Sequence, residues 1–320
     1  MRVLVTGGAG YIGSHLVDRL MEDGHRVFVI DNLFTGKIAN IAHHLGHERF
    51  TFVNEDVLHR ETMEGLVQQV DLIYHLAAVV GVHHVISNPL KGILTNVRGT
   101  ERVLETAGKY WRKVLIASSS EVYGKSERVP LAEEDDSVLG PTTAGRWSYA
   151  LAKALDEHLA FIYRDRGLST VIVRYFNSYG PRLDPRGYGS VIARFINQAL
   201  QGEPLTVFDD GRQTRCFTYV DDTVRGTVLA AALPQAEGLA FNIGSNRETF
   251  ILELAQMILQ LTGSRSEIHH VSYKEAYGPG FEETRRRVPD VRRAAEVLGF
   301  EAQIPLEDGL RRTIDWFRQG

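Results

Sequence analysis

Tyr149 and Lys153 are the two residues whose types and spacing point most directly to chemistry. They stand four positions apart in the segment Tyr-Ala-Leu-Ala-Lys, and residues at this spacing share one face of a helix. A phenol has an ordinary pKa of about 10, and a nearby ammonium group favours the phenolate. We therefore expect Tyr149 to act as a base near neutral pH, although the pair read alone also fits an ordinary surface contact.

A serine-rich turn precedes this pair and adds a second functional group. An apolar strand over residues 114–117 runs into Ser118, Ser119, Ser120 and Glu121. Ser119 stands at the end of the strand, where its hydroxyl can share a substrate hydroxyl with the phenol. For Glu121, a helix cap or a loop hydrogen bond remains the alternative to a role in the site.

The amino-terminal segment has the order of strand, glycine turn and helix that a dinucleotide site requires. A short apolar strand leads into Gly7, Gly10 and Gly13, with Tyr11 and Ile12 inside the turn. Glycine allows the backbone to approach a pyrophosphate, and the helix N-terminus supplies free N–H groups and a positive dipole. We expect these five residues to bind the cofactor.

Asp31 follows the second predicted strand, over residues 26–30, and indicates which dinucleotide is bound. A carboxylate there accepts hydrogen bonds from the adenosine ribose and repels the extra phosphate of NADP, so NAD is expected. A plain turn residue is the alternative. The other residues expected to contact NAD are Asn32, Asp56, Val57, Leu76, Ala77, Ala78, Asn96, Tyr149 and Lys153.

Strands and helices alternate as far as Tyr175, which predicts an α/β fold with a Rossmann doubly wound parallel sheet. We expect an NAD-binding domain over residues 1–175, with a return segment at about 214–245. A smaller α/β substrate-binding domain should contain most of residues 176–320 and interleave with the first. Within it, residues 205–208 and 214–217 are predicted to form a hairpin around Asp209-Asp210-Gly211.

Composition limits the other classes of function. Of 320 residues 43% are hydrophobic and 24% charged, and no apolar run reaches the roughly 18 residues that span a bilayer. A net charge of −4 gives no reason to expect nucleic acid. A strand beginning directly after Met1 leaves no room for a signal peptide, and a single cysteine, Cys216, cannot form an internal disulfide. We expect a cytoplasmic protein without a membrane partner.

Three histidines, His43, His44 and His47, lie in a predicted loop. His43 and His47 have the spacing of two metal ligands on a helix, but no acidic or thiol side chain lies close to them in the sequence. We therefore expect these histidines to be solvated and expect no metal site.

Together these motifs resemble the extended short-chain dehydrogenase/reductase family, in particular its NAD-dependent nucleotide-sugar epimerases, dehydratases and decarboxylases. The resemblance covers nearly the whole chain. It implies that Ser119, Tyr149 and Lys153 form a catalytic triad, that NAD stays bound and is recycled, and that a UDP-sugar is the substrate. It also implies a homodimer through a four-helix bundle built from the helices near residues 90–109 and 149–164.

The turn after the strand separates the members of this family. Dehydratases have Thr-Asp-Glu where residues 119–121 read Ser-Ser-Glu, so the acid that helps to remove water is missing here. Galactose-pathway epimerases usually lack the glutamate. UDP-glucuronate decarboxylases, also called UDP-xylose synthases, have Thr/Ser-Ser-Glu and an arginine three residues before the tyrosine, which is Arg146 here. The segments 213–215 and 287–290 also resemble decarboxylases.

The resemblance therefore implies oxidation of the sugar at C4, with Tyr149 accepting the hydroxyl proton. A C6 carboxylate would make the 4-keto sugar a β-keto acid, which loses carbon dioxide. Glu121 and Arg215 are expected to position C5 and to supply or relay its proton. A 4-epimerase acting on UDP-glucose or UDP-glucuronate shares the first step, and a non-catalytic NAD-binding regulator is a more distant alternative.

Anions in such a site need positive partners, because burying them unpaired is costly. The expected substrate-binding residues are Ser120, Arg146, Asn177, Arg182, Val191, Arg215 and Arg287, with Arg186 as a further candidate.

Overall fold

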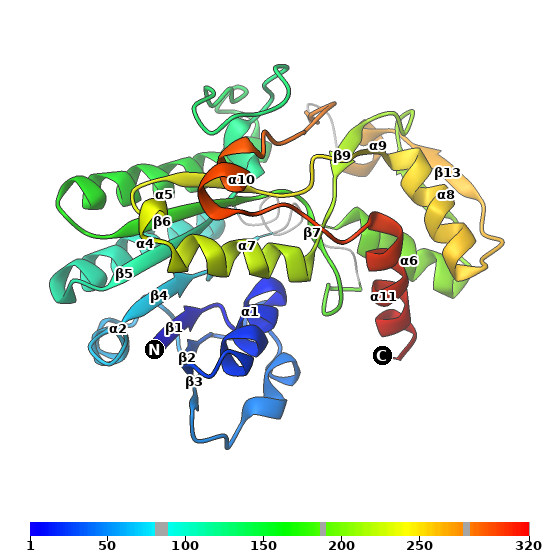
Figure 1. The fold of residues 1–320 in the computed structure, drawn as a ribbon. Coiled ribbons are helices and arrows are strands. Elements are labelled where there is room, and N and C mark those ends of the chain that lie inside the picture. Colours follow the sequence, from blue (N-terminus) through cyan, green and yellow to red (C-terminus); the bar gives the residue numbers. More distant parts are fainter. Residues whose placement is uncertain (81–88, 186–189, 278–281, 320) are drawn as a thin grey trace.

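The computed structural model describes residues 1–80, 89–185, 190–277 and 282–319 (Figure 1). Its central sheet has seven parallel strands in the order β11-β6-β5-β4-β1-β2-β3. These strands are β1 (Arg2–Thr6), β2 (Arg26–Ile30), β3 (Phe50–Val53), β4 (Leu72–His75), β5 (Lys113–Ser119), β6 (Thr170–Tyr175) and β11 (Ala240–Ile243). The order reverses between β1 and β4, as in doubly wound folds, so the predicted α/β fold with a Rossmann sheet is confirmed.

Alternating residues of β1 show why helices cover both faces of the sheet. Val3 and Val5 belong to the core that contains side chains of α1 (Tyr11–Glu22) and α7 (Val220–Ala232). Leu4 belongs to a second core, with α2 (Arg60–Val67), α4 (Pro89–Tyr110) and α5 (Ser148–Asp165). Since successive side chains of a strand point to opposite faces, an apolar strand of this kind must be covered on both sides.

The remaining elements lie mostly beside the carboxyl edge of the sheet, where α6, α8 and α11 form the part at the right of Figure 1. The helices are α6 (Val191–Gln201), α8 (Ile251–Thr262), α9 (Tyr273–Tyr277), α10 (Arg292–Leu298) and α11 (Leu306–Gln319). The strands are β7 (Ser178–Tyr179), β8 (Leu205–Phe208), β9 (Thr214–Cys216), β10 (Thr218–Tyr219), β12 (Glu248–Phe250) and β13 (Ile268–Val271). Short 3-10 helices are η1 (Ile38–Asn40), η2 (Ala42–His44), η3 (Ser120–Tyr123), η4 (Gly145–Trp147) and η5 (Pro234–Ala236).

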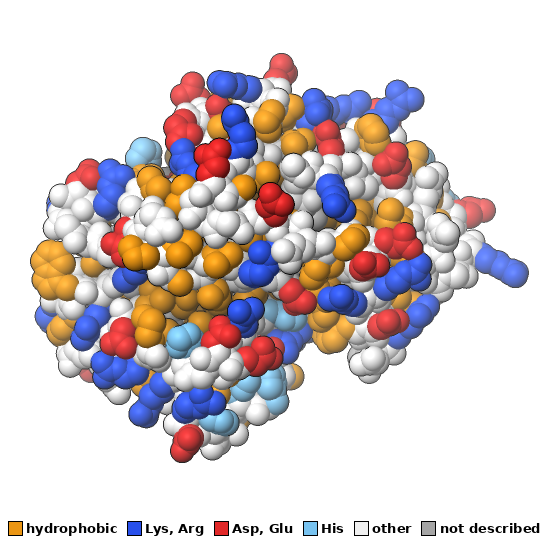
Figure 2. Space-filling model, in the orientation of Figure 1, with side chains coloured by type: hydrophobic (Ala, Val, Ile, Leu, Met, Phe, Trp, Pro, Cys, Tyr) orange, Lys and Arg blue, Asp and Glu red, His pale blue; other side chains and the backbone are white. Residues whose placement is uncertain are grey.

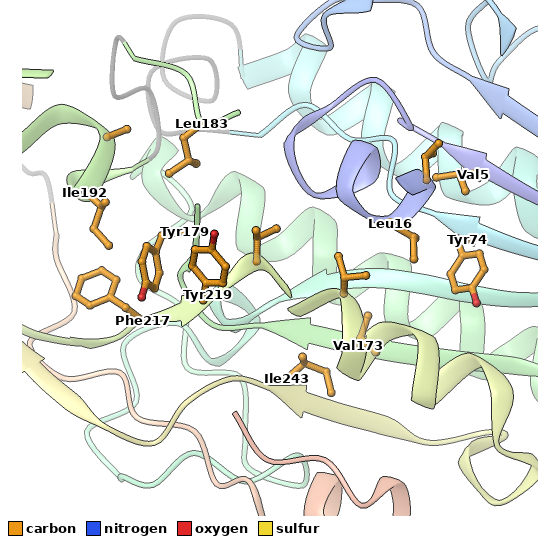
Figure 3. Close-up of a cluster of buried hydrophobic side chains, with 14 of the residues drawn as sticks. Val5, Leu16, Tyr74, Val173, Tyr179, Leu183, Ile192, Phe217, Tyr219 and Ile243 are labelled. Atoms are coloured by element: carbon orange, nitrogen blue, oxygen red, sulfur yellow. The ribbon is translucent and has the colours of Figure 1, made fainter. Parts of the chain in front are cut away.

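One apolar core joins the sheet to this smaller part. Figure 3 shows Val173 and Ile243 of the sheet in the same cluster as Ile192 of α6 and Phe217 beside β9. Tyr179 of β7 lies between them and is almost fully buried. Because this core is shared, the smaller part is held firmly against the carboxyl edge of the sheet.

The predicted hairpin of residues 205–208 with 214–217 is wrong. β8 pairs in parallel with β13, and β9 pairs antiparallel with β12. The turn between them is present, with Asp209 at φ 47° and Gly211 at φ 67°. Turn residues specify a change of direction but not the partner of each strand, and both strands here pair with segments much later in the chain.

Two surface observations complete the fold. Among the helices that the described residues form, none is both long and apolar enough to cross a membrane. Figure 2 shows acidic and basic side chains interspersed over one face of the molecule, so opposite charges lie close together there.

Candidate active site

A cavity of about 520 Å³ lies along the carboxyl ends of the central strands. Residues that end or follow five strands line it, among them Gly7, Asp31, Leu76, Ser119 and Tyr175. In open α/β sheets a ligand binds at this edge, because loops from both halves of the sheet diverge there.

The glycine turn at one end of the cavity has no room for side chains. Gly7 has φ 72°, and a Cβ on Gly13 would lie 2.1 Å from the Gly7 carbonyl oxygen. Gly10, the N-cap of α1, has no side chain to occupy the first N–H groups of the helix. These N–H groups can therefore bind an anion such as a pyrophosphate.

Asp31 lies next to this turn and is only 7% exposed. Its carboxylate accepts hydrogen bonds from the backbone N–H of Ala9 at 2.9 Å and of Leu33 at 2.8 Å. Burial raises the pKa of Asp31, and the two N–H donors partly offset this rise. The carboxylate is thus fixed at the cavity wall beside Asn32, whose amide donates to Asp56 at 2.8 Å.

Of the residues predicted to contact NAD, all but Asn96 line the cavity: Gly7, Gly10, Tyr11, Ile12, Gly13, Asp31, Asn32, Asp56, Val57, Leu76, Ala77, Ala78, Tyr149 and Lys153. Asn96 is 2% exposed and exchanges two hydrogen bonds with the backbone of Val79. Its amide therefore holds the segment after β4 in place, and no sequence pattern indicates that both of its polar groups are occupied in this way.

Ser119, Tyr149 and Lys153 all line the cavity, and Tyr149 interacts with both of the others. The Lys153 ammonium donates to the carbonyl of Ala117 at 3.0 Å and to Asp156 at 3.2 Å. Burial raises the pKa of Tyr149, while Lys153 and a hydrogen bond with Ser119 lower it, and the net pKa stays above the ordinary value. The predicted lowering by Lys153 is present, but burial outweighs it.

Glu121 lies between two arginines at the cavity wall. It accepts from Arg146 at 2.7 Å and from Arg287 at 2.5 Å, and both arginine side chains are at most 8% exposed. Burial raises the pKa of Glu121, but Arg287 and Arg146 lower it by more, so the net pKa lies well below the usual range. Glu121 is consequently a carboxylate at neutral pH.

Arg215 and Glu283 form a second ion pair next to Arg146. Arg215 donates to Glu283 at 2.6 Å and to the carbonyls of Thr214 and Thr284, and Glu283 also lies 3.9 Å from Arg146. Glu121, Glu283, Arg146, Arg215 and Arg287 are together called the arginine-glutamate group below. Among the described residues, Arg146, Arg287 and Glu121 of this group line the cavity, whereas Arg215 does not.

The other predicted substrate residues are divided between the cavity wall and its support. Ser120, Asn177 and Arg182 line the cavity, whereas Val191 does not and its neighbour Ser190 does. The Asn177 amide donates to the carbonyl of Cys216 at 3.0 Å. Arg186 lies outside the described residues.

No acidic side chain lies close to these histidines in the sequence, but one does in the fold, and the expectation that all three are solvated is wrong for His44, whose side chain is 14% exposed. Asp18 of α1 accepts from His43 at 2.8 Å and from His44 at 2.7 Å, and its other oxygen pairs with Arg182 at 2.7 Å. These residues are far apart in sequence, which is why spacing missed the contact. The arginine opposes a second cation on the same carboxylate, and Asp18 instead holds Arg182 at the cavity wall.

Fold and cavity define this chain as a Rossmann-type α/β protein whose cavity extends from a glycine turn to the arginine-glutamate group. It belongs to the NAD dependent epimerase/dehydratase family, whose pattern matches residues 3–244, and NAD is its cofactor.

Two curated relatives resemble it over nearly its full length. The chain is 45% identical over 322 residues to the UDP-N-acetyl-alpha-D-glucosaminuronate decarboxylase of Bacillus cytotoxicus, covering 99% of this chain and 98% of that protein. It is 41% identical over 319 residues to UDP-glucuronic acid decarboxylase 1 of Xenopus tropicalis, covering 99% of this chain and 72% of that protein. Among solved structures, UDP-glucuronic acid 4-epimerase from Bacillus cereus, with UDP-glucuronic acid and NAD, is similar at a TM-score of 0.90 and 32% identity, covering 100% and 99% of the two chains.

Proposed function

We propose that this enzyme decarboxylates a UDP-linked hexuronate, with UDP-glucuronate as the first candidate substrate and UDP-xylose as the product. One observation carries the proposal: a partly buried, ionised Glu121 that pairs with the buried Arg146 and Arg287 in the same cavity as the triad. The names of the two curated relatives support it.

The first step uses the triad. Tyr149 accepts the proton of the sugar 4-hydroxyl, Ser119 hydrogen-bonds to the same oxygen, and Lys153 stabilises the phenolate that precedes this transfer. NAD held by Tyr149, Lys153 and the glycine turn would supply the hydride acceptor for C4 and the hydride that is returned to it.

The second step depends on the arginine-glutamate group. Three guanidinium groups against two carboxylates leave one positive charge at this end of the cavity. A carboxylate on C6 of the sugar balances this charge, since a buried anion needs a charged or hydrogen-bonded partner. Once C4 is a ketone, the substrate is a β-keto acid, so its C5–C6 bond breaks with release of carbon dioxide.

Glu121 takes a limited part in the protonation that follows. Because its pKa lies well below the usual range, it holds no proton at neutral pH and cannot donate one from its resting state. As a carboxylate it can accept a hydrogen bond from the water molecule whose proton reaches C5, and so orient that water. Of the two predicted roles for Glu121, supplying the C5 proton or relaying it, we propose the relay, by way of this water.

Two alternatives share the first step. A substrate with a 2-acetamido group is favoured by the 45% identity to a UDP-N-acetyl-glucosaminuronate decarboxylase. A 4-epimerase is favoured by the likeness to the Bacillus cereus epimerase structure. Both decarboxylases release carbon dioxide, whereas an epimerase retains the carboxylate.

A substrate panel tests the proposal. The protein with NAD is incubated separately with UDP-glucuronate, UDP-N-acetylglucosaminuronate and UDP-glucose, and products are followed by mass spectrometry and proton NMR, with Tyr149→Phe as the inactive control. Loss of one carbon dioxide from either uronate supports the proposal and identifies the substrate. A product of unchanged mass with inverted C4 would refute decarboxylation.

The surface of α4 and α5 supports a proposal about assembly. Large apolar side chains stay exposed along α4 and α5: Leu94 by 36%, Leu155 by 43%, Ile162 by 48%, Leu151 by 54% and Leu90 by 67%. We propose that these helices form a four-helix bundle with a second copy, since exposed apolar patches mark association surfaces. Light scattering should give a dimer, and Leu151→Glu should give a monomer.

We also propose a cytoplasmic location. The free, buried Cys216 accords with the reducing environment of that compartment.

The two ligands are expected to bind to different parts of the chain. We propose that residues 1–175, with the return segment at about 214–245, bind NAD, and that most of residues 176–320 bind the sugar nucleotide. Substitutions at Asp31 should then change NAD affinity without changing affinity for UDP, and this is measured by calorimetry with each ligand.

A further inference from the structure

A buried carboxylate lies directly behind the catalytic lysine and has no part in the mechanism above. Asp156 follows Lys153 by three residues on α5, and its side chain is fully buried. The Lys153 ammonium lies 3.2 Å from Asp156 and is itself only 4% exposed. A buried charge pair beside the reacting atoms is costly to form, which makes a structural role alone a poor explanation.

The pair fixes the direction of the ammonium group. An ammonium carries three N–H donors. Those of Lys153 reach the carbonyl of Ala117 at 3.0 Å and the carboxylate of Asp156 at 3.2 Å, and the residue lines the cavity. One donor is therefore left for the cavity side, where the phenol of Tyr149 lies.

The charge of Asp156 also counteracts the charge of the lysine. Burial raises the pKa of Tyr149, Lys153 lowers it, and the carboxylates of Glu121 and Asp156 raise it further. Burial lowers the pKa of Lys153, but Asp156 and Tyr149 raise it by more, so the lysine remains charged.

The other charged groups around this pair have partners of their own. Glu157 of α5 pairs with Arg174 of β6 at 2.6 Å, and Glu121 of η3 pairs with its two arginines. His75 of β4 is held neutral, since burial lowers its pKa to about 3. Among the described residues that face Lys153, Asp156 is thus the carboxylate paired with the lysine itself.

We propose that Asp156 is a positioning residue that aims the Lys153 ammonium at the cavity and moderates the positive charge it presents to Tyr149. The proposal rests on the proposed function, in which Tyr149 is the base for the sugar 4-hydroxyl. It predicts that the phenol of Tyr149 ionises at a higher pH in the wild-type protein than in a variant whose Lys153 lacks this counter-ion.

Asp156→Asn is the informative variant, because it keeps the size of the side chain and an oxygen for the lysine but removes the charge. Without the carboxylate, Lys153 acts on Tyr149 without its counter-ion, while Tyr149 and Glu157 still favour the charged lysine, so the Tyr149 pKa falls. We expect the acidic limb of kcat/KM against pH to move down by about one unit, which is tenfold in rate below the limb. Asp165→Asn, at the exposed end of the same helix, is the matched control and should move nothing.

A second readout needs no substrate. Tyrosinate absorbance is titrated on the NAD-bound protein, and the difference between a protein and its Tyr149→Phe counterpart isolates this phenol. The transition should move down in Asp156→Asn together with the kinetic limb. Asp156→Ser, which also removes the charge, repeats the measurement with a smaller side chain, and circular dichroism checks the fold of both.

The outcomes separate this proposal from the proposed function. If the difference titration stays in place in a folded Asp156→Asn protein, the proposal is overturned, even if kcat falls, because a merely structural role would lower kcat alone. If no UDP-uronate is consumed but the titration moves, the inference holds while the proposed substrate does not.

Discussion

The two ends of the cavity are built in different ways. At the NAD end, Gly7, Gly10 and Gly13 form a continuous backbone turn, and Asp31 is fixed by backbone N–H groups. At the other end, the arginine-glutamate group brings together side chains from η3, η4, β9 and the segment before α10. The NAD end is shaped largely by the backbone of residues that are close together in the sequence. The other end consists of charged side chains from residues that are far apart in the sequence. NAD binding should therefore tolerate substitutions in the arginine-glutamate group, and the following variants test whether the two ends are independent.

Tyr149→Phe should have the largest effect, because it removes the base from the junction of the two ends. We expect kcat to fall by about 10³-fold or more, with NAD still bound. Steady-state kinetics and the NAD content of the purified protein measure this. Tyr163→Phe, near the far end of α5, should keep full activity, and a Tyr149→Phe enzyme with normal turnover would rule out the proposed base.

Glu121→Gln should disturb the charged end alone. Product formation should slow by about 10²-fold while C4 oxidation persists, so NADH absorbance should accumulate in a single turnover. Normal turnover without NADH build-up would contradict the role given to this carboxylate.

The same variant should also lose stability at neutral pH. Removing the carboxylate leaves Arg146 and Arg287 buried without it, at a cost of about 3 kcal/mol. Since the folded pKa of Glu121 lies below its unfolded value, the wild-type advantage exists above an unfolded pKa of about 4.3 and declines as the pH falls below it. Urea unfolding at neutral and acidic pH should show the gap between the two proteins narrowing, and a constant gap would refute the ionised state.

Asp31→Ala should act at the NAD end alone. The backbone N–H groups of Ala9 and Leu33 lose their acceptor and the ribose loses its partner, so NAD affinity should fall by about 10- to 100-fold. Calorimetry with NAD and with UDP distinguishes the ends, and Asp23→Ala on the surface of α1 serves as the control. An equal loss of UDP affinity would show that the ends are coupled.

His75 gives the smallest effect, on stability rather than activity. It contacts Thr6 at 2.8 Å and Thr100 at 3.1 Å, and burial lowers its pKa from 6.5 to about 3. As the pH falls, His75 therefore takes up a proton in the unfolded chain before it does so in the folded protein. Above pH 6.5 this group does not change the free energy of unfolding, and below it the free energy of unfolding decreases, by about 2 kcal/mol at pH 5. His75→Asn should flatten this part of the stability curve, whereas His47→Asn, on an exposed residue, should not.

The difference between the two ends also explains what sequence reasoning can reach. The glycine turn, Asp31 and the strands of the sheet follow from local patterns, and the structure has them where they are predicted. Tertiary pairing does not follow: β8 and β9 have separate partners in place of a hairpin, and Arg215 turns to Glu283 behind the cavity wall. Glu283 was missed because it lies in a loop without periodicity.

The most direct test of the account is proton NMR of UDP-glucuronate incubated with the protein and NAD in deuterium oxide. We predict release of carbon dioxide and a UDP-pentose that carries one deuterium at C5, placed by solvent through the group around Glu121, and none at C4, where the original hydrogen returns. A UDP-uronate that keeps its carboxylate and has an inverted C4 would contradict the central claim that the arginine-glutamate group commits the 4-keto sugar to decarboxylation.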